Sequence, residues 1–178
     1  LSSGQRRLWF SDRLHPGGLE WVAPVFLRVP PELTPPQLAA ALTGLEERHE
    51  VLRTRFADRG GEPVAVVAPA GPVELRVVDL PDRPVDTPID TPINTPINTP
   101  INEAAEAAVL AGLFAEQFGR GFDLENGPIW RALFVRIPHR PGVVLLTVHH
   151  IATDGWSAVV LERDLGRLCR AALAADPA

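Results

Sequence analysis

Two adjacent histidines, His149 and His150, are followed by a short stretch that contains Asp154 and Gly155. An imidazole titrates near neutral pH, so a histidine here could accept a proton from an amine or a hydroxyl nucleophile. The pair closes an apolar segment typical of a strand, and successive side chains of a strand point to opposite faces. Only one of the two imidazoles can therefore face a given cleft. Asp154 could orient an imidazole, or it could pair with a buried arginine and fix the loop.

Other kinds of catalytic or metal site fit the sequence poorly. Adjacent histidines on a strand are badly placed to share a metal ion, and no third ligand stands at a suitable spacing, so we expect no metal site. No serine lies in a G-x-S-x-G context, and we expect Ser157 to be a helix cap or a supporting group rather than a nucleophile. Cys169, the single cysteine, lies near the apolar stripe of a helix and is expected to be a core residue. No glycine-rich phosphate-binding loop is present.

Length and composition narrow the class of protein. The 178 residues are enough for one domain with a hydrophobic core. The net charge is −5 and the basic residues do not cluster, which argues against nucleic-acid binding. No apolar run approaches the roughly 20 residues that span a bilayer, so we expect a cytoplasmic protein with no membrane contact. The chain starts at Leu1, and we expect it to be a piece of a longer polypeptide.

The elements that must position the histidines follow from periodicity and turn residues. The segments 129–138 and 143–150 are expected to form an antiparallel hairpin at the centre of a covered sheet, because both are apolar on two faces. The other expected strands cover 24–30, 51–58, 63–69 and 73–80, and the expected helices cover 2–14, 35–49, 102–118 and the stretch after 155. This mixed order predicts an α/β sandwich with helices on a mostly antiparallel or mixed sheet.

A low-complexity segment interrupts this pattern at 86–102, where an Asp/Asn-Thr-Pro-Ile tetrapeptide is repeated four times. Each proline lacks an N–H and disfavours a helical conformation of the residue before it, which excludes a central strand or helix. An extended spacer is the expected conformation. We interpret the repeat as a surface insertion that the fold tolerates rather than as a ligand for a partner, since loops accept insertions at little cost in free energy.

Three stretches resemble, in the same order, core motifs of the condensation domains of nonribosomal peptide synthetases. They are SSGQRRLWF at 2–10, RHEVLRTRF at 48–56 and VHHIATDGWS at 148–157, the last of which carries the H-H-x-x-x-D-G signature. The stretch at 122–134 also has the character of this family. The first motif departs from the usual pattern at Gly4, where alanine is common.

The resemblance implies a fold and a reaction. Condensation domains have two lobes, each like chloramphenicol acetyltransferase, with a tunnel between them, and residues 1–178 would form only the N-terminal lobe. The implied reaction joins a donor peptidyl or aminoacyl thioester to the amine of an acceptor aminoacyl thioester. Upstream and downstream carrier proteins hold both substrates on phosphopantetheine arms, so no cofactor binds the domain directly. The products would be peptides such as antibiotics or siderophores.

The resemblance also assigns roles to five residues. His150 would face the tunnel and either remove a proton from the acceptor amine or hold that amine by a hydrogen bond. Gly155 would leave room for substrate and offer its backbone N–H, and His149 would support the site. Asp154 would be structural and paired with an arginine, for which Arg53 is the candidate.

Related functions are distinguished by the residues around this motif. Epimerization domains share the signature but usually continue D-G-V-S-W, whereas Gly155 is followed here by Trp156 and Ser157, which favours condensation. Ala152 resembles the alanine of domains that accept a D-configured donor and an L-configured acceptor. The alternative from another class is a module that docks a carrier protein or a tailoring enzyme without catalysis. An isolated lobe, with half of the tunnel missing, is expected to be inactive alone.

Overall fold

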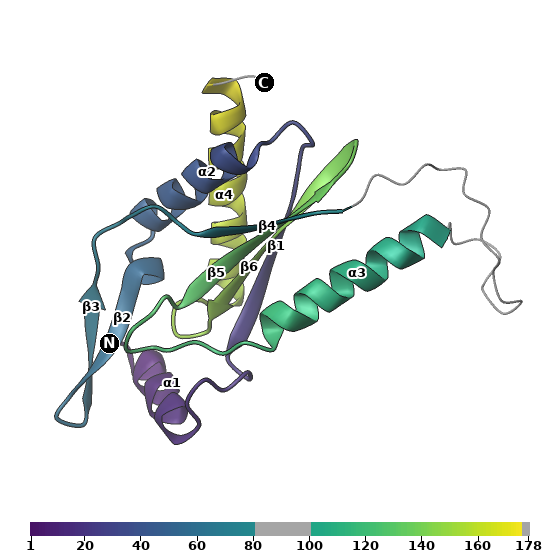
Figure 1. Cartoon of the computed structure of the whole chain (residues 1–178). Helices are drawn as coiled ribbons and strands as arrows, with labels where there is room; N and C mark the ends of the chain where they lie inside the picture. Colours follow the sequence, from purple (N-terminus) through teal and green to yellow (C-terminus); the bar gives the residue numbers. More distant parts are fainter. Residues whose placement is uncertain (81–100, 176–178) are drawn as a thin grey trace, which may run out of the picture.

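The computed structural model describes the backbone of residues 1–80 and 101–175, and the side chains of 1–80 and 107–175 (Figure 1). The tetrapeptide repeat predicted at 86–102 therefore lies almost entirely outside the described residues. Four helices, a short 3₁₀ helix and six strands make up the described part of the chain: α1 (Ser3–Leu14), β1 (Val22–Val29), α2 (Pro35–Arg48), η1 (Glu50–Arg53), β2 (Thr54–Arg59), β3 (Glu62–Val67), β4 (Leu75–Asp79), α3 (Ile101–Phe118), β5 (Trp130–Ile137), β6 (Arg140–His149) and α4 (Gly155–Ala175).

A four-stranded mixed sheet with the order β1-β6-β5-β4 forms the centre of the molecule. β6 runs antiparallel to both β1 and β5, whereas β4 runs parallel to β5. β2 and β3 form a separate hairpin that projects beside α1 (Figure 1). The mixed sheet and the central hairpin of β5 and β6 are both as predicted from the sequence.

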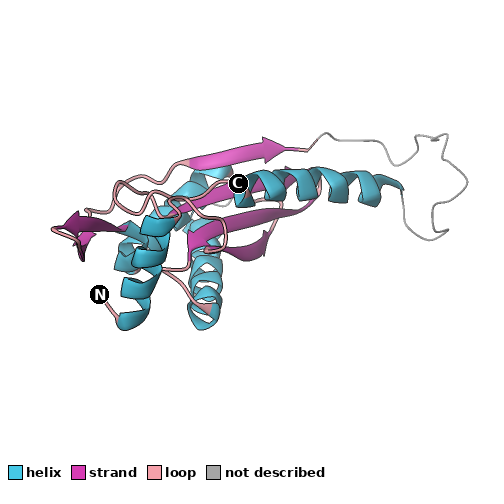
Figure 2. Cartoon of the chain, turned by 90° about the horizontal axis from the view of Figure 1, so that it is seen from below, coloured by secondary structure: helices cyan, strands magenta, loops and turns pink. Residues whose placement is uncertain are grey.

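Helices cover both faces of this sheet. On one face, α2 and α4 pack against a large core that includes Leu42, Leu165 and Phe134. On the other face, α3 packs through partly buried side chains such as Phe114 and Phe118 over a smaller core (Figure 2). Alternate residues of β5 and β6 serve the two cores, because neighbouring side chains of a strand point to opposite faces. This explains why both strands are apolar throughout their central part.

Local sequence sets the start of the first two helices. Ser2 and Gln5 form a reciprocal capping box at α1, and Thr34 and Gln37 form another at α2, so each helix has its first free N–H groups satisfied. Pro35 occupies the first turn of α2, where the missing N–H costs nothing. These boxes fix where α1 and α2 enter the fold.

Two predicted strand starts are wrong by three residues. β6 begins at Arg140 and not at 143. The strand expected from Val51 begins only at Thr54, and the residues before it form the 3₁₀ helix η1. Leu52 is 2% exposed and buried in the larger core, so the apolar alternation that suggested a strand reflects burial on a helical turn. Arg53 therefore does not extend from a strand beside Arg55.

Candidate functional site

The histidine motif forms a tight connection between β6 and α4. His149 is the last residue of β6, and its N–H donates to the Ile129 carbonyl at 2.9 Å. The His150 N–H donates to the Trp21 carbonyl at 2.8 Å, just before β1 begins. The turn is closed by the Ala152 N–H, which donates to the carbonyl of His149 at 2.9 Å. The backbone around both imidazoles is therefore tied to the neighbouring segments of the sheet.

The His149 imidazole is buried and neutral. The residue is 1% exposed, and its Nδ1 accepts a hydrogen bond from the Ile151 N–H at 3.0 Å. An accepting Nδ1 carries no proton, so the neutral ring is protonated at Nε2. Burial lowers the pKa of His149 to about 4; the neighbouring His150 contributes to the decrease and Glu20 opposes it. The ring packs edge-to-face against Phe122, with centroids 6.2 Å apart. His149 thus has no lone pair to offer a substrate.

His150 has the opposite tautomer. Its half-buried ring places Nδ1 3.2 Å from the Thr153 carbonyl oxygen. A carbonyl oxygen can only accept, so Nδ1 carries a proton, and in the neutral ring Nε2 then keeps its lone pair. No hydrogen bond to this Nε2 occurs within 1–80 and 107–175. Of the two adjacent histidines, His150 is the one whose imidazole can accept a hydrogen bond or a proton.

Asp154 caps helix α4, and this corrects the predicted ion pair with Arg53. The exposed Asp154 carboxylate accepts from the N–H and from the hydroxyl of Ser157, both at 2.7 Å. These two hydrogen bonds lower its pKa. Arg53 instead donates to the Ala68 carbonyl at 2.6 Å and to the Glu50 carboxylate at 3.4 Å. Its guanidinium thus ties η1 to the end of β3, while Asp154 satisfies free N–H groups of a helix N-terminus.

Gly155 is the first residue of α4 and is exposed. A Cβ atom added at this position would meet no heavy atom within 4 Å. The N-terminus of a helix presents unsatisfied N–H groups and a partial positive charge. The space beside Gly155 is therefore open to solvent in this chain, and it lies at the helix end that the Asp154 carboxylate caps.

Comparisons with known proteins bear on this geometry. The family model of the condensation domain matches residues 1–177. This chain belongs to the condensation-domain family. Similar curated proteins include nonribosomal peptide synthetase agiA of Aspergillus flavus, 38% identical over 99% of the chain, and phosphinothricin tripeptide synthetase PhsC of Streptomyces viridochromogenes, 37% identical over 97% of it. The chain spans only 2% and 14% of the length of these two relatives.

Solved structures have the same fold as this condensation-domain chain. The starter condensation domain of the rhizomide synthetase RzmA superimposes with a TM-score of 0.75 at 16% identity, over 96% of the chain and 37% of that domain. The X-domain in its complex with OxyB from teicoplanin biosynthesis gives a TM-score of 0.75 at 27% identity, over 98% of the chain and 33% of the other. The predicted α/β fold of a single condensation-domain lobe is confirmed.

The three condensation motifs contact one another in space. From the first motif, the Gln5 side-chain amide donates to the Ile151 carbonyl of the third motif at 3.3 Å. The indole N–H of Trp9, also in the first motif, donates to the Phe56 carbonyl of the second motif at 3.1 Å. Helix α1 therefore holds the histidine turn with one side chain and the β2 strand with another.

A buried carboxylate on α4 joins the second and third motifs, and it was not predicted from the sequence. Asp164 is 3% exposed and accepts from Arg48 Nε at 2.8 Å, while His49 Nε2 lies 3.1 Å from the same oxygen. Arg163 also donates to this carboxylate, at 3.0 Å. The sequence does contain a pattern that indicates this carboxylate, because Asp164 stands three residues after Leu161 on the apolar stripe of the last helix. A charge inside such a stripe indicates a buried partner.

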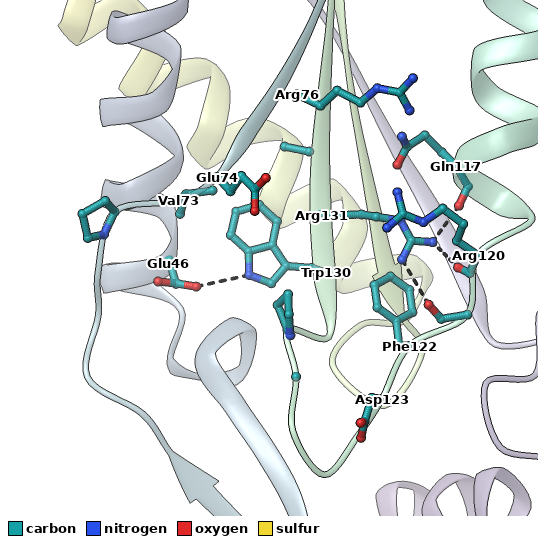
Figure 3. Close-up of a pocket in the computed structure, with 15 residues that line it drawn as sticks. Glu46, Val73, Glu74, Arg76, Gln117, Arg120, Phe122, Asp123, Trp130 and Arg131 are labelled. Atoms are coloured by element: carbon teal, nitrogen blue, oxygen red, sulfur yellow. Dashed lines mark hydrogen bonds between the residues drawn. The ribbon is translucent and has the colours of Figure 1, made fainter.

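A hollow lies between the segment before β4, the end of α3 and the start of β5 (Figure 3). Its volume is about 700 Å³, and none of the five predicted site residues lines it. Arg131 projects into the hollow with its guanidinium 4.2 Å from the centre of the Phe122 ring. The guanidinium donates to the carbonyls of Gln117 at 2.6 Å, Gly121 at 3.2 Å and Arg120. Burial, helped by the nearby Arg120, lowers the pKa of Arg131 to about 10.

Two further findings concern the described residues alone. Among them, no three histidine, cysteine or acidic side chains come together in a group that could hold a metal ion. No helix in this part of the chain combines the length and the apolar character needed to cross a membrane.

Proposed function

We propose that the chain is the N-terminal lobe of a condensation domain that forms a peptide bond between two carrier-bound thioesters. The observation that carries the proposal is the pair of opposite histidine tautomers. His149 is buried, accepts at Nδ1 and carries its proton on Nε2, whereas His150 keeps a lone pair at Nε2. That lone pair can accept from the N–H of an acceptor amine, whether the proton is transferred or only held.

The reaction follows from this arrangement. The acceptor amine attacks the donor thioester carbonyl, a C–N bond forms and the C–S bond breaks. The amine loses a proton and the departing sulfur of the phosphopantetheine arm gains one. His150 Nε2 would carry this proton if it acts as the base, and would only hold the amine if it acts as a positioning group. Gly155 would place no side chain near the reacting carbonyl, and its backbone N–H would donate to the oxygen of the tetrahedral intermediate.

The test of this function is His150→Ala in the synthetase polypeptide that carries this sequence together with its loaded carrier proteins. Dipeptide on the downstream carrier, followed by intact-protein mass spectrometry, should form about 10² to 10⁴ times more slowly, as when general acid–base catalysis is lost. His139→Asn, in the exposed turn between β5 and β6, is the matched control and should turn over normally. Normal turnover by His150→Ala would refute a chemical role for this residue.

Proton transfer and simple positioning predict different solvent isotope effects. If His150 removes the proton of the amine in the slow step, the chemical step should be slower in D₂O than in H₂O, and His150→Ala should lose this isotope effect. A group that only accepts a hydrogen bond from the amine gives a loss of rate in His150→Ala without a change in the isotope effect. Single-turnover rates in H₂O and in D₂O separate the two roles.

A docking function without catalysis is favoured by one observation. The teicoplanin X-domain, 27% identical to this chain, was solved in complex with OxyB. Titration of carrier proteins against the synthetase polypeptide that carries this sequence, with turnover measured alongside, separates docking from catalysis, because binding without turnover supports docking alone.

The stereochemical subtype is part of the main proposal: Ala152 suggests a D-configured donor and an L-configured acceptor. Turnover of L-donor and D-donor aminoacyl carriers, compared side by side, tests this choice, and a clear preference for the L-donor contradicts it.

A further inference from the structure

We propose that Trp21 is a positioning residue that holds the His150 imidazole in its catalytic tautomer; this inference rests on the function proposed above. Trp21 lies in the connection between α1 and β1, outside the three condensation motifs. Its carbonyl accepts from the His150 N–H at 2.8 Å. Its indole also meets the His150 ring edge-to-face, with centroids 6.4 Å apart and planes at 88°. Backbone and side chain of one residue therefore both contact His150.

The position of Trp21 is itself fixed from two sides. The indole N–H donates to the Ser11 hydroxyl on α1 at 3.2 Å. The connection that carries the indole packs closely against the link before β5, where a Cβ at Gly121 would lie only 2.0 Å from the Gly17 carbonyl oxygen. A side chain at position 121 would force these two backbones apart. The indole is thus tied to α1 by its N–H, in a connection that is packed against the link before β5.

The indole has a specific effect on the imidazole. His150 has left the β6 strand, and its ring is anchored by one hydrogen bond, from Nδ1–H to the Thr153 carbonyl at 3.2 Å. A neutral imidazole in water prefers to carry its proton on Nε2, the nitrogen that must stay unprotonated here. The edge-to-face contact limits rotation of the ring about its Cβ–Cγ bond and so keeps Nδ1 against Thr153. We infer that Trp21 increases the population of the reactive tautomer.

Two readouts test this inference. Turnover is measured in the synthetase polypeptide, with carriers loaded, for Trp21→Leu, Trp21→Phe and Ser11→Ala. Trp21→Leu should lower kcat about tenfold or more, because small misplacements of a catalytic group reach about 10²-fold, while KM for the acceptor carrier stays within about twofold. Trp21→Phe keeps an aromatic edge and should retain most of the rate. Ser11→Ala frees the indole and should give an intermediate loss.

The second readout is the tautomer of His150, observed by nitrogen NMR of the ¹⁵N-histidine-labelled chain. In the unaltered chain the Nδ1–H form should dominate, and in Trp21→Leu the Nε2–H form should grow. Phe26→Leu is the matched control. Phe26 is a half-exposed aromatic residue on β1 whose ring packs against that of Phe114, with the ring centroids 5.3 Å apart, away from the motif. The substitution should cost a similar amount of packing and change neither tautomer nor kcat.

The outcomes distinguish this inference from the function on which it rests. The role of Trp21 alone is overturned if Trp21→Leu and Phe26→Leu have the same kcat and the same His150 tautomer while His150→Ala is inactive. Full activity of His150→Ala instead overturns the proposed role of His150, and absence of dipeptide formation by the unaltered polypeptide overturns the proposed function. If Trp21→Leu does not fold, Trp21→Phe and Ser11→Ala decide: an unchanged tautomer and an unchanged rate in Ser11→Ala refute the inference.

Discussion

The buried His149 should make the stability of the chain depend on pH in a defined window. Its pKa is 6.5 when unperturbed and about 4 in the folded chain, chiefly because the ring is buried. Between these values the unfolded chain binds one more proton than the folded chain at this residue. Lowering the pH therefore favours unfolding, so the stability that neutral His149 provides is complete above pH 6.5 and is lost progressively down to pH 4.

The size of the effect follows from the difference between the two pKa values. Each pKa unit corresponds to about 1.4 kcal/mol, so the free energy of unfolding should fall by roughly 3 kcal/mol across the window on account of this one group. The buried carboxylate of Asp164 affects stability at lower pH. Burial opposes ionisation of Asp164, but hydrogen bonds from Arg163 and Arg48 lower its pKa below 3.8, so its contribution is lost only in stronger acid.

The perturbation that isolates this effect is His149→Asn. The amide oxygen of asparagine can take over the hydrogen bond from the Ile151 N–H, now accepted by Nδ1 at 3.0 Å, but asparagine does not titrate. Urea unfolding at pH 7.0, 5.5 and 4.5 gives the free energy of unfolding for both chains. The decrease from pH 7.0 to 4.5 should be smaller in His149→Asn by about 2–3 kcal/mol.

A control and a refuting result complete the experiment. His139→Asn removes a histidine from an exposed turn, where positive φ suits asparagine, and should leave the pH dependence of the unaltered chain in place. Parallel decreases in His149→Asn and the unaltered chain would show that His149 is not held neutral by burial. That result would also remove the argument that only His150 can accept a proton.

Two further predictions concern the carboxylates of the motif region. Asp164→Asn should lower the free energy of unfolding at pH 7 by about 2–3 kcal/mol. This is less than the roughly 3–5 kcal/mol lost when one partner of a fully buried ion pair is removed. The reason is that the side chains of Arg48 and Arg163 are more than half exposed, so water can solvate their charges once the carboxylate is gone. Urea unfolding measures the loss, and a loss no larger than that of Glu162→Gln, an exposed neighbour, contradicts it. Asp154→Ala should lower Tm only slightly, and less than Asp164→Asn does, because an exposed cap is lost; thermal unfolding followed by circular dichroism checks the order, and a larger decrease would reinstate a buried ion pair.

Local patterns predicted most of the fold. The capping residues Thr34 and Gln37, the apolar stripe of α2 and the two-sided apolar strands act within a few residues of each other, so the sequence displays them directly. The error at η1 has a physical reason too. A short run of alternating apolar residues has the same appearance whether a strand or a tight helical turn buries it, and Leu52 is buried in either case.

The partners within the site were harder to predict. The family motif led to a paired Asp154, but the side chain that α4 buries against the second motif is Asp164, ten residues further on. Which carboxylate meets Arg48 depends on how α2 and α4 pack, and spacing along the chain does not contain that information. Trp21 was missed for the same reason: it reaches His150 only because β1 pairs with β6.

The arrangement of the three motifs explains why they occur together. The histidine turn is packed on one side only: Ile151 and Ala152 are buried in the larger core, whereas Gly155 is open and Asp154 is exposed. Further support comes from the other two motifs: Gln5 holds the Ile151 carbonyl, and Arg48 anchors the helix that follows the turn through Asp164. In the proposed function the turn presents an imidazole to substrate, so its reactive side must stay uncovered. The first two motifs therefore support the turn from its other side, and they also contribute Trp9, Leu52 and Phe56 to the core.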